Sequence, residues 1–133
     1  MTVAFPSTEY FRALQAGLED PTATEGVEPS EAYCGFRIDS SLFVLEFDGR
    51  VCSAVVSGGN PIDLDFVVGG SLNAWERAVG ACPEGPRRLD ELLSDGGLVI
   101  ETDADDGEVL AQAALPMLQA FLDQARRIEA ETR

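Results

Sequence analysis

The chain has 133 residues, of which 45% are hydrophobic and 25% are charged. Asp and Glu number 24 and Lys and Arg number 9, so the formal net charge is −15, and histidine is absent. This charge argues strongly against nucleic acid as a partner and disfavours anionic membranes, because both attract clustered positive residues. Without histidine, serine–histidine and cysteine–histidine nucleophile pairs and histidine-liganded zinc are excluded within the chain.

The length suits one domain, which we expect to span residues 1–133 with the first and last five residues frayed. Cys34, Cys52 and Cys82 form no C-x-x-C motif, and their odd number argues against a disulfide framework. They lack basic sequence neighbours, so we expect unreactive free thiols. The N-terminus lacks the features of a secretory signal, and no apolar run approaches the ~18 residues of a membrane span. A cytoplasmic protein without stable membrane insertion is therefore expected.

The first third of the chain predicts a helix and then a β region. Pro6-Ser7 supplies a helix start, and Asp20-Pro21 ends the helix because the residue before a proline is driven out of helical geometry. Between them, apolar residues recur at helical spacing, namely Tyr10, Phe11, Leu14 and Leu18. Residues 22–30 are rich in Thr, Glu, Gly and Pro, which predicts a solvated connector. Alternation of apolar and polar residues over 36–39 then indicates a half-buried strand.

Asp48-Gly49 is the clearest hairpin signal, and it predicts that a strand over 42–47 pairs with one over 50–56. A two-residue turn at this dipeptide sets three cross-strand pairs, which are Phe47 with Arg50, Leu45 with Cys52, and Phe43 with Ala54. In this register the better core candidate is the face that carries Phe43, Leu45, Phe47, Cys52, Ala54 and Val56. The opposite face carries Glu46, Ser53 and several valines.

A fourth strand and two helical segments follow the hairpin. The strand is predicted over 62–68, where Ile62, Leu64, Phe66 and Val68 alternate with Asp63 and Asp65. Ser71 is a good N-cap for a helix whose apolar face carries Leu72, Trp75, Val79 and Cys82. A short amphipathic piece is then predicted over 88–93, and a fifth strand over 98–102.

The acidic turn 103–107 opens the last helix, because negative charge is favourable near a helix N-terminus. Its apolar stripe consists of Leu110, Ala114, Met117, Phe121, Ala125 and Ile128. Pro116 lies within this stripe and predicts a kink or a division of the helix in two. The stripe can be read as core, as a lid over a ligand, or as an edge for a partner subunit. The order of all these elements predicts an α+β fold, with one sheet and helices packed on one face.

Several short blocks of the sequence resemble one known family. They are the start Phe5–Phe11, the hairpin at Asp48-Gly49, and Ile62–Phe66 running into Ser71–Trp75. A late strand, an acidic turn and a terminal apolar helix complete the order, so the resemblance covers residues 5 to about 128. The sequence is similar to bacterial members of the sterol carrier protein 2 superfamily. The resemblance implies a single, twisted, mostly antiparallel five-stranded sheet covered on one face by helices.

Members of that superfamily hold sterols, fatty acyl chains or other lipophiles in an apolar tunnel between the two layers, and no catalytic residues carry over. The resemblance therefore implies a non-catalytic carrier domain for an apolar small molecule (lipid, sterol, fatty acyl or polyketide-like), without a cofactor. The expected cavity lining is Phe43, Leu45, Ala54, Leu64, Phe66, Trp75, Val79, Met117, Phe121 and Leu122. A filled core is the other interpretation of the same residues.

Two other functions stay open on the sequence. A small pocket enzyme of the isomerase or cyclase type could use Asp63, Asp65 or Glu46 as a general base, although half-buried strands ordinarily carry carboxylates on their wet face. Alternatively, an acidic face could dock on a basic protein partner, or two copies of the chain could form a homodimer. The acidic segment 101–107 does not have the spacing of a calcium loop, so we expect no metal site.

Overall fold

The computed structural model describes residues 5–58, 64–80, 86–103 and 105–126. In chain order its elements are α1 (Thr8–Leu18), the 3-10 helix η1 (Pro21–Thr24), β1 (Ser30–Ile38), β2 (Ser41–Gly49), β3 (Val51–Ser57), β4 (Phe66–Gly70), α2 (Leu72–Val79), α3 (Leu89–Asp95), β5 (Leu98–Glu101) and α4 (Gly107–Asp123). Within those ranges, no helix has both the length and the apolar character that crossing a membrane requires.

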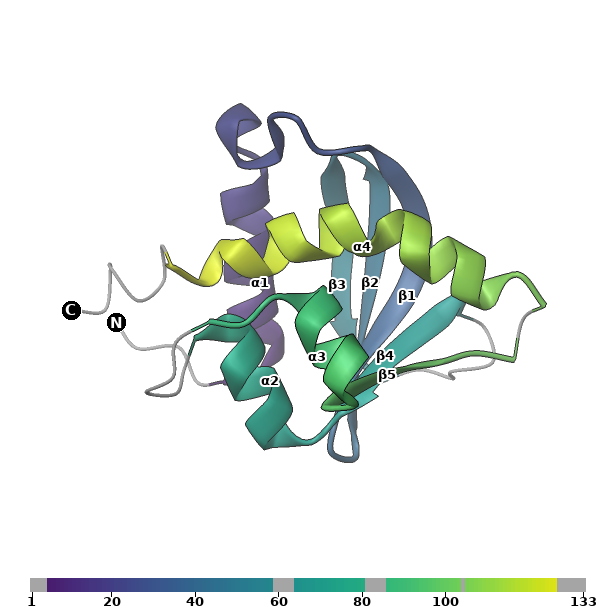
Figure 1. Ribbon diagram of the computed structural model, residues 1–133. Helices are drawn as coiled ribbons and strands as arrows, with labels where there is room; N and C mark the ends of the chain where they lie inside the picture. The colour runs from purple at the N-terminus through teal and green to yellow at the C-terminus, as the bar shows by residue number, and fades with distance from the viewer. Residues whose placement is uncertain (1–4, 59–63, 81–85, 104, 127–133) are drawn as a thin grey trace.

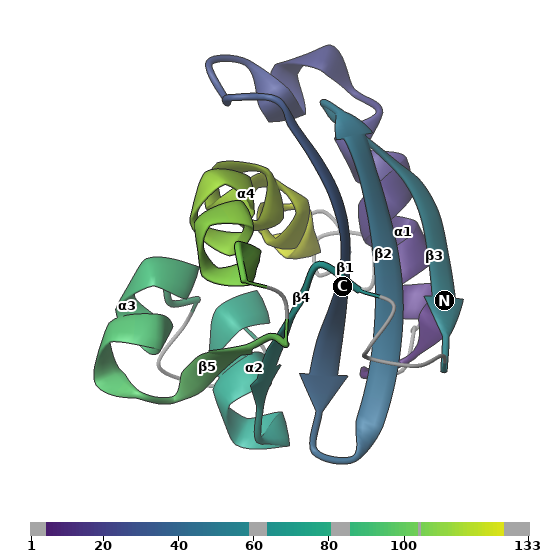
Figure 2. The ribbon, with the colours of Figure 1, turned by 90° about the vertical axis from the view of Figure 1, so that its right-hand side faces the viewer.

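The five strands form one sheet in the order β3-β2-β1-β4-β5. The β1–β2, β2–β3 and β4–β5 pairs are antiparallel, whereas the central β1–β4 pair is parallel. Figure 1 shows α4 crossing in front of the sheet, and Figure 2 shows α2, α3 and α4 together on one side of it. We call this helix-covered side the inner face and the opposite side the outer face. The predicted α+β fold, a mostly antiparallel five-stranded sheet with helices on one face, is confirmed.

Two serines begin the helices that the sequence predicts. The Ser7 hydroxyl oxygen accepts a hydrogen bond from the Tyr10 N–H at 3.0 Å, and Ser71 does the same for Ala74 at 3.2 Å. Each serine satisfies one of the backbone donors that the first helical turn leaves without a partner. Local side-chain chemistry therefore sets where α1 and α2 start.

The segment after α1 has more structure than a solvated connector. The Asp20 carboxylate accepts from the Thr22 N–H at 3.0 Å and caps η1, whose last residue, Thr24, is buried. β1 then begins at Ser30, several residues before the predicted strand, because it pairs with β2 along its whole length.

The predicted register of the β2–β3 hairpin was wrong. Asp48 pairs with Val51, so the two turn residues are Gly49 and Arg50, and Gly49 has a φ of 70°. A positive φ is strained for residues that carry a Cβ, which explains why glycine occupies the first position of this turn.

A β-bulge in β3 changes which residues face the helices. Phe47 pairs with Cys52 whereas Glu46 pairs with Ala54, so Ser53 is the extra residue of the bulge. Beyond the bulge, Val55 lies opposite Leu45 and is buried. The inward alternation of the hairpin therefore shifts by one residue within β3, which the two-residue-turn argument did not anticipate.

The later elements differ from the predictions in their limits. β4 begins at Phe66, since Leu64 and Asp65 form a bend before it, and the predicted strand residues 62 and 63 lie outside the described residues. α4 is one helix through Pro116 and is not divided in two. Because proline has no N–H, the helical hydrogen bond to the Gln112 carbonyl is missing at that point.

Candidate functional site

The inner face of the sheet and the helices enclose one layer of apolar side chains. Eight of the ten residues that the sequence suggests for a ligand's cavity lie in this layer, and each is at most 6% exposed. They are Phe43, Leu45, Phe66, Trp75, Val79, Met117, Phe121 and Leu122. Their contact with a ligand stays a prediction.

Aromatic rings fill the middle of this inner layer. The Phe121 ring lies 6.3 Å from that of Phe11 and 6.1 Å from that of Phe36, between ring centroids. The Phe36 ring lies 4.6 Å from Trp75, whose indole N–H donates to the Arg37 carbonyl at 2.9 Å. Rings at these separations contact one another directly, so a ligand would have to displace them.

The helix α4 closes the inner layer over β1 and β4. The residues that it turns inward change in size along its length, from Ala111 and Ala114 to Met117 and Phe121. In the first half, Leu110 and Leu115 pack partly buried against the layer, and Pro116 stands between the two halves. The first half of α4 is therefore the part that the fewest large side chains anchor.

The remaining two residues of the predicted lining lie elsewhere. Ala54 pairs with Glu46, on the outer face, since the bulge in β3 reverses its direction. Leu64 is buried, but it packs in a separate outer cluster with Val44 and Val67. Neither residue contributes to the inner layer.

Two of the three carboxylates considered as general bases, Glu46 and Asp65, are not part of the inner layer. Glu46 is exposed and accepts a hydrogen bond from the Ser53 hydroxyl at 2.8 Å. The Asp65 carboxylate accepts from the Tyr33 N–H at 3.0 Å, before the start of β4. Asp63 lies outside the described residues.

Two thiols lie within the inner layer. Cys34 and Cys52 are free and buried, and burial raises the pKa of both. For Cys52 the pKa rises to about 12. Protonated thiols are poor nucleophiles, so neither residue has the character of a catalytic cysteine. Cys82 lies outside the described residues, and within them no group of three metal-ligating side chains could hold a metal ion.

One polar side chain is buried at the contact of α1 and α4. The Gln124 amide donates to the Ala120 carbonyl at 3.0 Å, whereas its carbonyl oxygen has no hydrogen-bond partner among the described residues. Since a carbonyl can only accept, the bond to Ala120 fixes which end of the amide is the oxygen. A buried acceptor without a partner costs roughly 1–3 kcal/mol, so it would gain from a ligand that donates a hydrogen bond.

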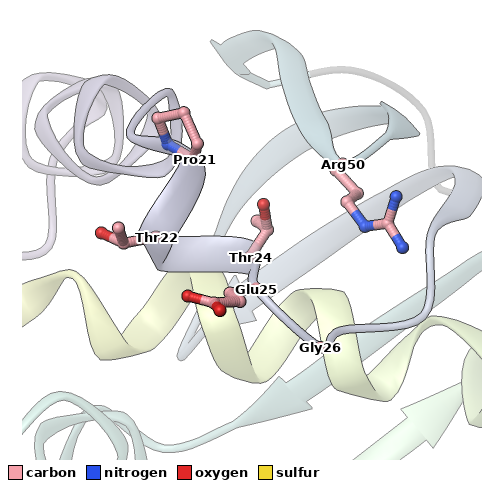
Figure 3. Close-up of a pocket in the computed structure, with 6 residues that line it drawn as sticks. All are labelled: Pro21, Thr22, Thr24, Glu25, Gly26 and Arg50. Atoms are coloured by element: carbon pink, nitrogen blue, oxygen red, sulfur yellow. The ribbon is translucent and has the colours of Figure 1, made fainter.

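Four hollows on the described surface lie away from the predicted lining. One, of about 430 Å³, is formed by Pro21, Thr22, Thr24, Glu25, Gly26 and Arg50. Figure 3 shows Arg50, from the β2–β3 turn, across from the η1 segment. Two others flank Pro116 of α4, and a fourth lies beside β5. None of the ten residues of the predicted lining borders any of these hollows.

Solved structures show which fold this arrangement represents. The chain is similar to a crystal structure of sterol carrier protein 2, with 14% identity and a TM-score of 0.67. The similarity covers 94% of this chain and 97% of the sterol carrier protein 2 chain. The chain has the sterol carrier protein 2 fold. It is also similar to a conserved protein of Thermus thermophilus named as a candidate sterol carrier protein, with 20% identity, a TM-score of 0.58, and 96% and 91% of the two chains covered.

A third similar structure is the UbiJ ubiquinone synthesis protein, with 17% identity, a TM-score of 0.50, and 89% and 90% of the two chains covered. No protein-family model matches the sequence, and the search of curated proteins gives no match. The likeness to sterol carrier protein 2 is therefore one of fold, over nearly the whole of both chains.

The inner layer also contains residues that the predicted lining omits. Phe11 and Leu14 of α1 and Phe36 of β1 are fully buried in it. Their signal was present in the sequence, as helical spacing in α1 and alternation in β1. They were omitted because pattern alone does not tell which buried residues a ligand would touch.

Proposed function

We propose that this chain is a non-catalytic carrier that binds a lipophilic small molecule between the inner face of the sheet and α4. The observation that carries the proposal is the sterol carrier protein 2 fold with a predominantly apolar inner layer. Sterols and ubiquinone, which the names of the similar proteins mention, are both mostly hydrocarbon. The proposed ligand class is a lipid, sterol, isoprenoid, fatty acyl or polyketide-like molecule.

Such a ligand enters by displacing α4 rather than by filling an open tunnel. The inner layer is closely packed, and the first half of α4 is held by small residues such as Ala111 and Ala114. A chain of twelve carbons gains about 10 kcal/mol from burial at ~0.8 kcal/mol per methylene. Association and the opening of the layer offset much of this gain, so micromolar dissociation constants are expected.

Charge and hydrogen bonding favour a neutral ligand that carries a hydroxyl group. The net charge of −15 repels a carboxylate. The buried Gln124 carbonyl oxygen offers an acceptor at the end of the layer between α1 and α4. A long-chain alcohol is therefore expected to bind more tightly than the fatty acid of the same length. A sterol is likewise expected to bind more tightly than a fatty acid.

Energy transfer from Trp75 tests the proposal directly. The chain has 1 tryptophan, and it is fully buried in the inner layer, so titration with the fluorescent sterol dehydroergosterol reports binding close to it. Saturable transfer with a micromolar midpoint is expected. Transfer no greater than that given by free tryptophan at the same sterol concentration contradicts the proposal.

A pair of neighbouring alanines locates the bound sterol. Ala114 faces the sheet and is 1% exposed, whereas Ala113 is on the solvent side of the same helix. Ala114→Leu narrows the inner layer and is expected to weaken sterol binding about tenfold, which corresponds to ~1.4 kcal/mol. Ala113→Leu is expected to change the dissociation constant by less than about twofold. Circular dichroism melts of both variants show whether each is folded. Equal loss in both variants, with both folded, argues against a site beneath α4.

A further inference from the structure

The two edge strands of the sheet, β3 and β5, differ in the contacts that the rest of the chain makes with their backbones. At the β3 edge, the Gln15 side chain of α1 donates to the Cys52 carbonyl at 2.7 Å, and Arg12 donates to the Val55 carbonyl at 3.5 Å. The bulge at Ser53 further interrupts this strand. Covering helices and bulges are the usual means of preventing a sheet edge from pairing with another chain.

At the β5 edge, α3 packs against the strand, but the described part of the chain supplies no side-chain hydrogen bond like those at β3. There, no side chain forms a hydrogen bond with the backbone of Leu98–Glu101 on the side away from β4. Val99 of this strand is 46% exposed, and Val109, in the first turn of α4, is 71% exposed. An open strand with exposed valines offers both backbone hydrogen bonds and apolar contact to an added strand.

A hollow of about 320 Å³ lies along the same edge. It is lined by Leu93 of α3, by Leu98, Val99 and Ile100 of β5, and by Glu108 and Gln112 of α4. Alternate side chains of a strand added to β5 would point toward this hollow, since side chains alternate between the two faces of a sheet. The edge therefore combines an open backbone with a place for side chains.

The rim of this hollow is negatively charged. We use the term acidic rim for Glu108, which lines the hollow, together with the exposed residues Asp103, Asp105 and Asp106, which precede it in the segment between β5 and α4. None of these four residues forms an ion pair with an arginine of the described chain. On neighbouring elements, Arg37 is held by Glu101 and Arg87 by Asp95, so these cations do not neutralise the rim. The rim is complementary to lysine or arginine and repels a second copy of this acidic chain.

We propose that the β5 edge docks an extended, positively charged segment of a partner protein, which adds a strand to the sheet. The backbone of β5 supplies the hydrogen bonds, the hollow between α3 and α4 receives the apolar side chains, and the acidic rim selects basic ones. This docking uses the β5 edge rather than the space beneath α4, although Leu98 borders both the hollow and the inner layer, and it does not depend on a bound lipophile.

Nuclear magnetic resonance of ¹⁵N-labelled protein tests the proposal, with a short blocked peptide of alternating lysine and valine as the probe. Shifts are expected at the backbone amides of residues 98–101 and at the hollow residues Leu93 and Gln112. The same peptide with alternate backbone amides N-methylated cannot pair as a strand, and it is expected to cause no shifts at β5. Replacing its lysines with glutamate is expected to abolish binding as well.

Two valines of nearly equal exposure provide the matched variants. Val99→Lys puts a positive charge on the open β5 edge, and Val56→Lys makes the same change at β3, where the valine is 48% exposed. Val99→Lys is expected to weaken peptide binding at least tenfold and Val56→Lys less than twofold. Equal weakening by the two variants means that the net charge alone governs binding, and it overturns the proposal.

Two further results overturn it. One is a set of shifts that the N-methylated peptide reproduces, which indicates electrostatic adsorption without strand pairing. The other is dimerisation of the unliganded protein that Val99→Lys abolishes in sedimentation velocity, which makes a second copy the occupant of β5. The titrations contain no lipophile, so their failure leaves the carrier proposal standing.

Discussion

The inner and outer faces of the sheet are built from alternate residues of the same strands, and they differ in the side chains that cover them. The inner face joins a continuous layer of apolar side chains beneath the helices. The outer face carries the exposed ion pair of Arg37 and Glu101 and a small separate cluster around Leu64. Among the described residues, the extended apolar layer lies on the inner face, which is the side where the proposed function places a lipophile.

Glycines in the strands leave room for neighbouring side chains to lie across the outer face. A Cβ on Gly35 would lie 2.8 Å from a methyl carbon of Leu42 and 2.9 Å from one of Leu64, so these leucines lie directly over β1. A Cβ on Gly69 would lie 2.6 Å from a guanidinium nitrogen of Arg37, which shows that the ion pair crosses β4 at that glycine. The outer face is thus covered by side chains that reach over bare backbone, whereas the inner face is filled by aromatic rings.

The largest difference between the faces is expected for a large-to-small change in the inner layer. Phe121→Ala removes a fully buried ring and should lower the free energy of unfolding by about 4 kcal/mol, measured by urea denaturation with Trp75 fluorescence. Val56→Ala on the outer face should cost less than about 0.5 kcal/mol. Comparable losses for the two variants would show that the inner layer is loosely packed and would break the comparison.

A smaller effect is expected where the outer face is tightest. Gly35→Ala should cost about 1 kcal/mol, because the ends of Leu42 and Leu64 can rotate to make room for the added methyl group. In a Leu64→Ala background the same change should cost less, since one of the two close contacts is gone. Thermal melts of the four proteins in this cycle measure the coupling, and strict additivity would mean that Leu64 does not lie over Gly35.

The smallest effect is expected for the outer ion pair. Arg37 donates to both oxygens of Glu101 and thereby holds the pKa of that carboxyl below its usual value. Both side chains are partly exposed, so Glu101→Gln should cost at most about 1 kcal/mol at pH 7 and less in high salt.

The pH dependence of this difference has a definite sign. A carboxyl whose pKa is lower in the folded state stabilises the protein above its unfolded pKa, and the stabilisation is lost as pH falls through the folded pKa. The gap in stability between wild type and Glu101→Gln should therefore close as the solution is acidified. A gap that persists in acid would mean that the glutamine loses packing rather than charge.

Much of the fold follows from local sequence patterns. Ser7 and Ser71 cap the helices that their neighbours predict, and alternation identifies the inward residues of β1 and β2. The bulge at Ser53 was not predictable, because nothing in its own sequence separates an inserted residue from regular alternation. Its presence moved Ala54 to the outer face and Val55 to the inner one.

The candidate site was predictable in its chemistry but not in its packing. Buried apolar positions such as Phe43, Trp75 and Phe121 follow from periodicity. Whether they leave space depends on how the rings of separate elements interdigitate, for example Phe11 of α1 with Phe121 of α4. Fits of this kind depend on distances between elements, which the sequence pattern does not contain.

Intermolecular nuclear Overhauser effects from 1-dodecanol to methyl-labelled protein test the carrier account most directly. The account predicts contacts from the alkyl chain to inner methyl groups, such as those of Leu14, Val68 and Met117, and weaker binding of dodecanoate. Contacts confined to the outer cluster at Leu64 and Val67, or no contacts with dodecanol present up to its solubility limit, would contradict it.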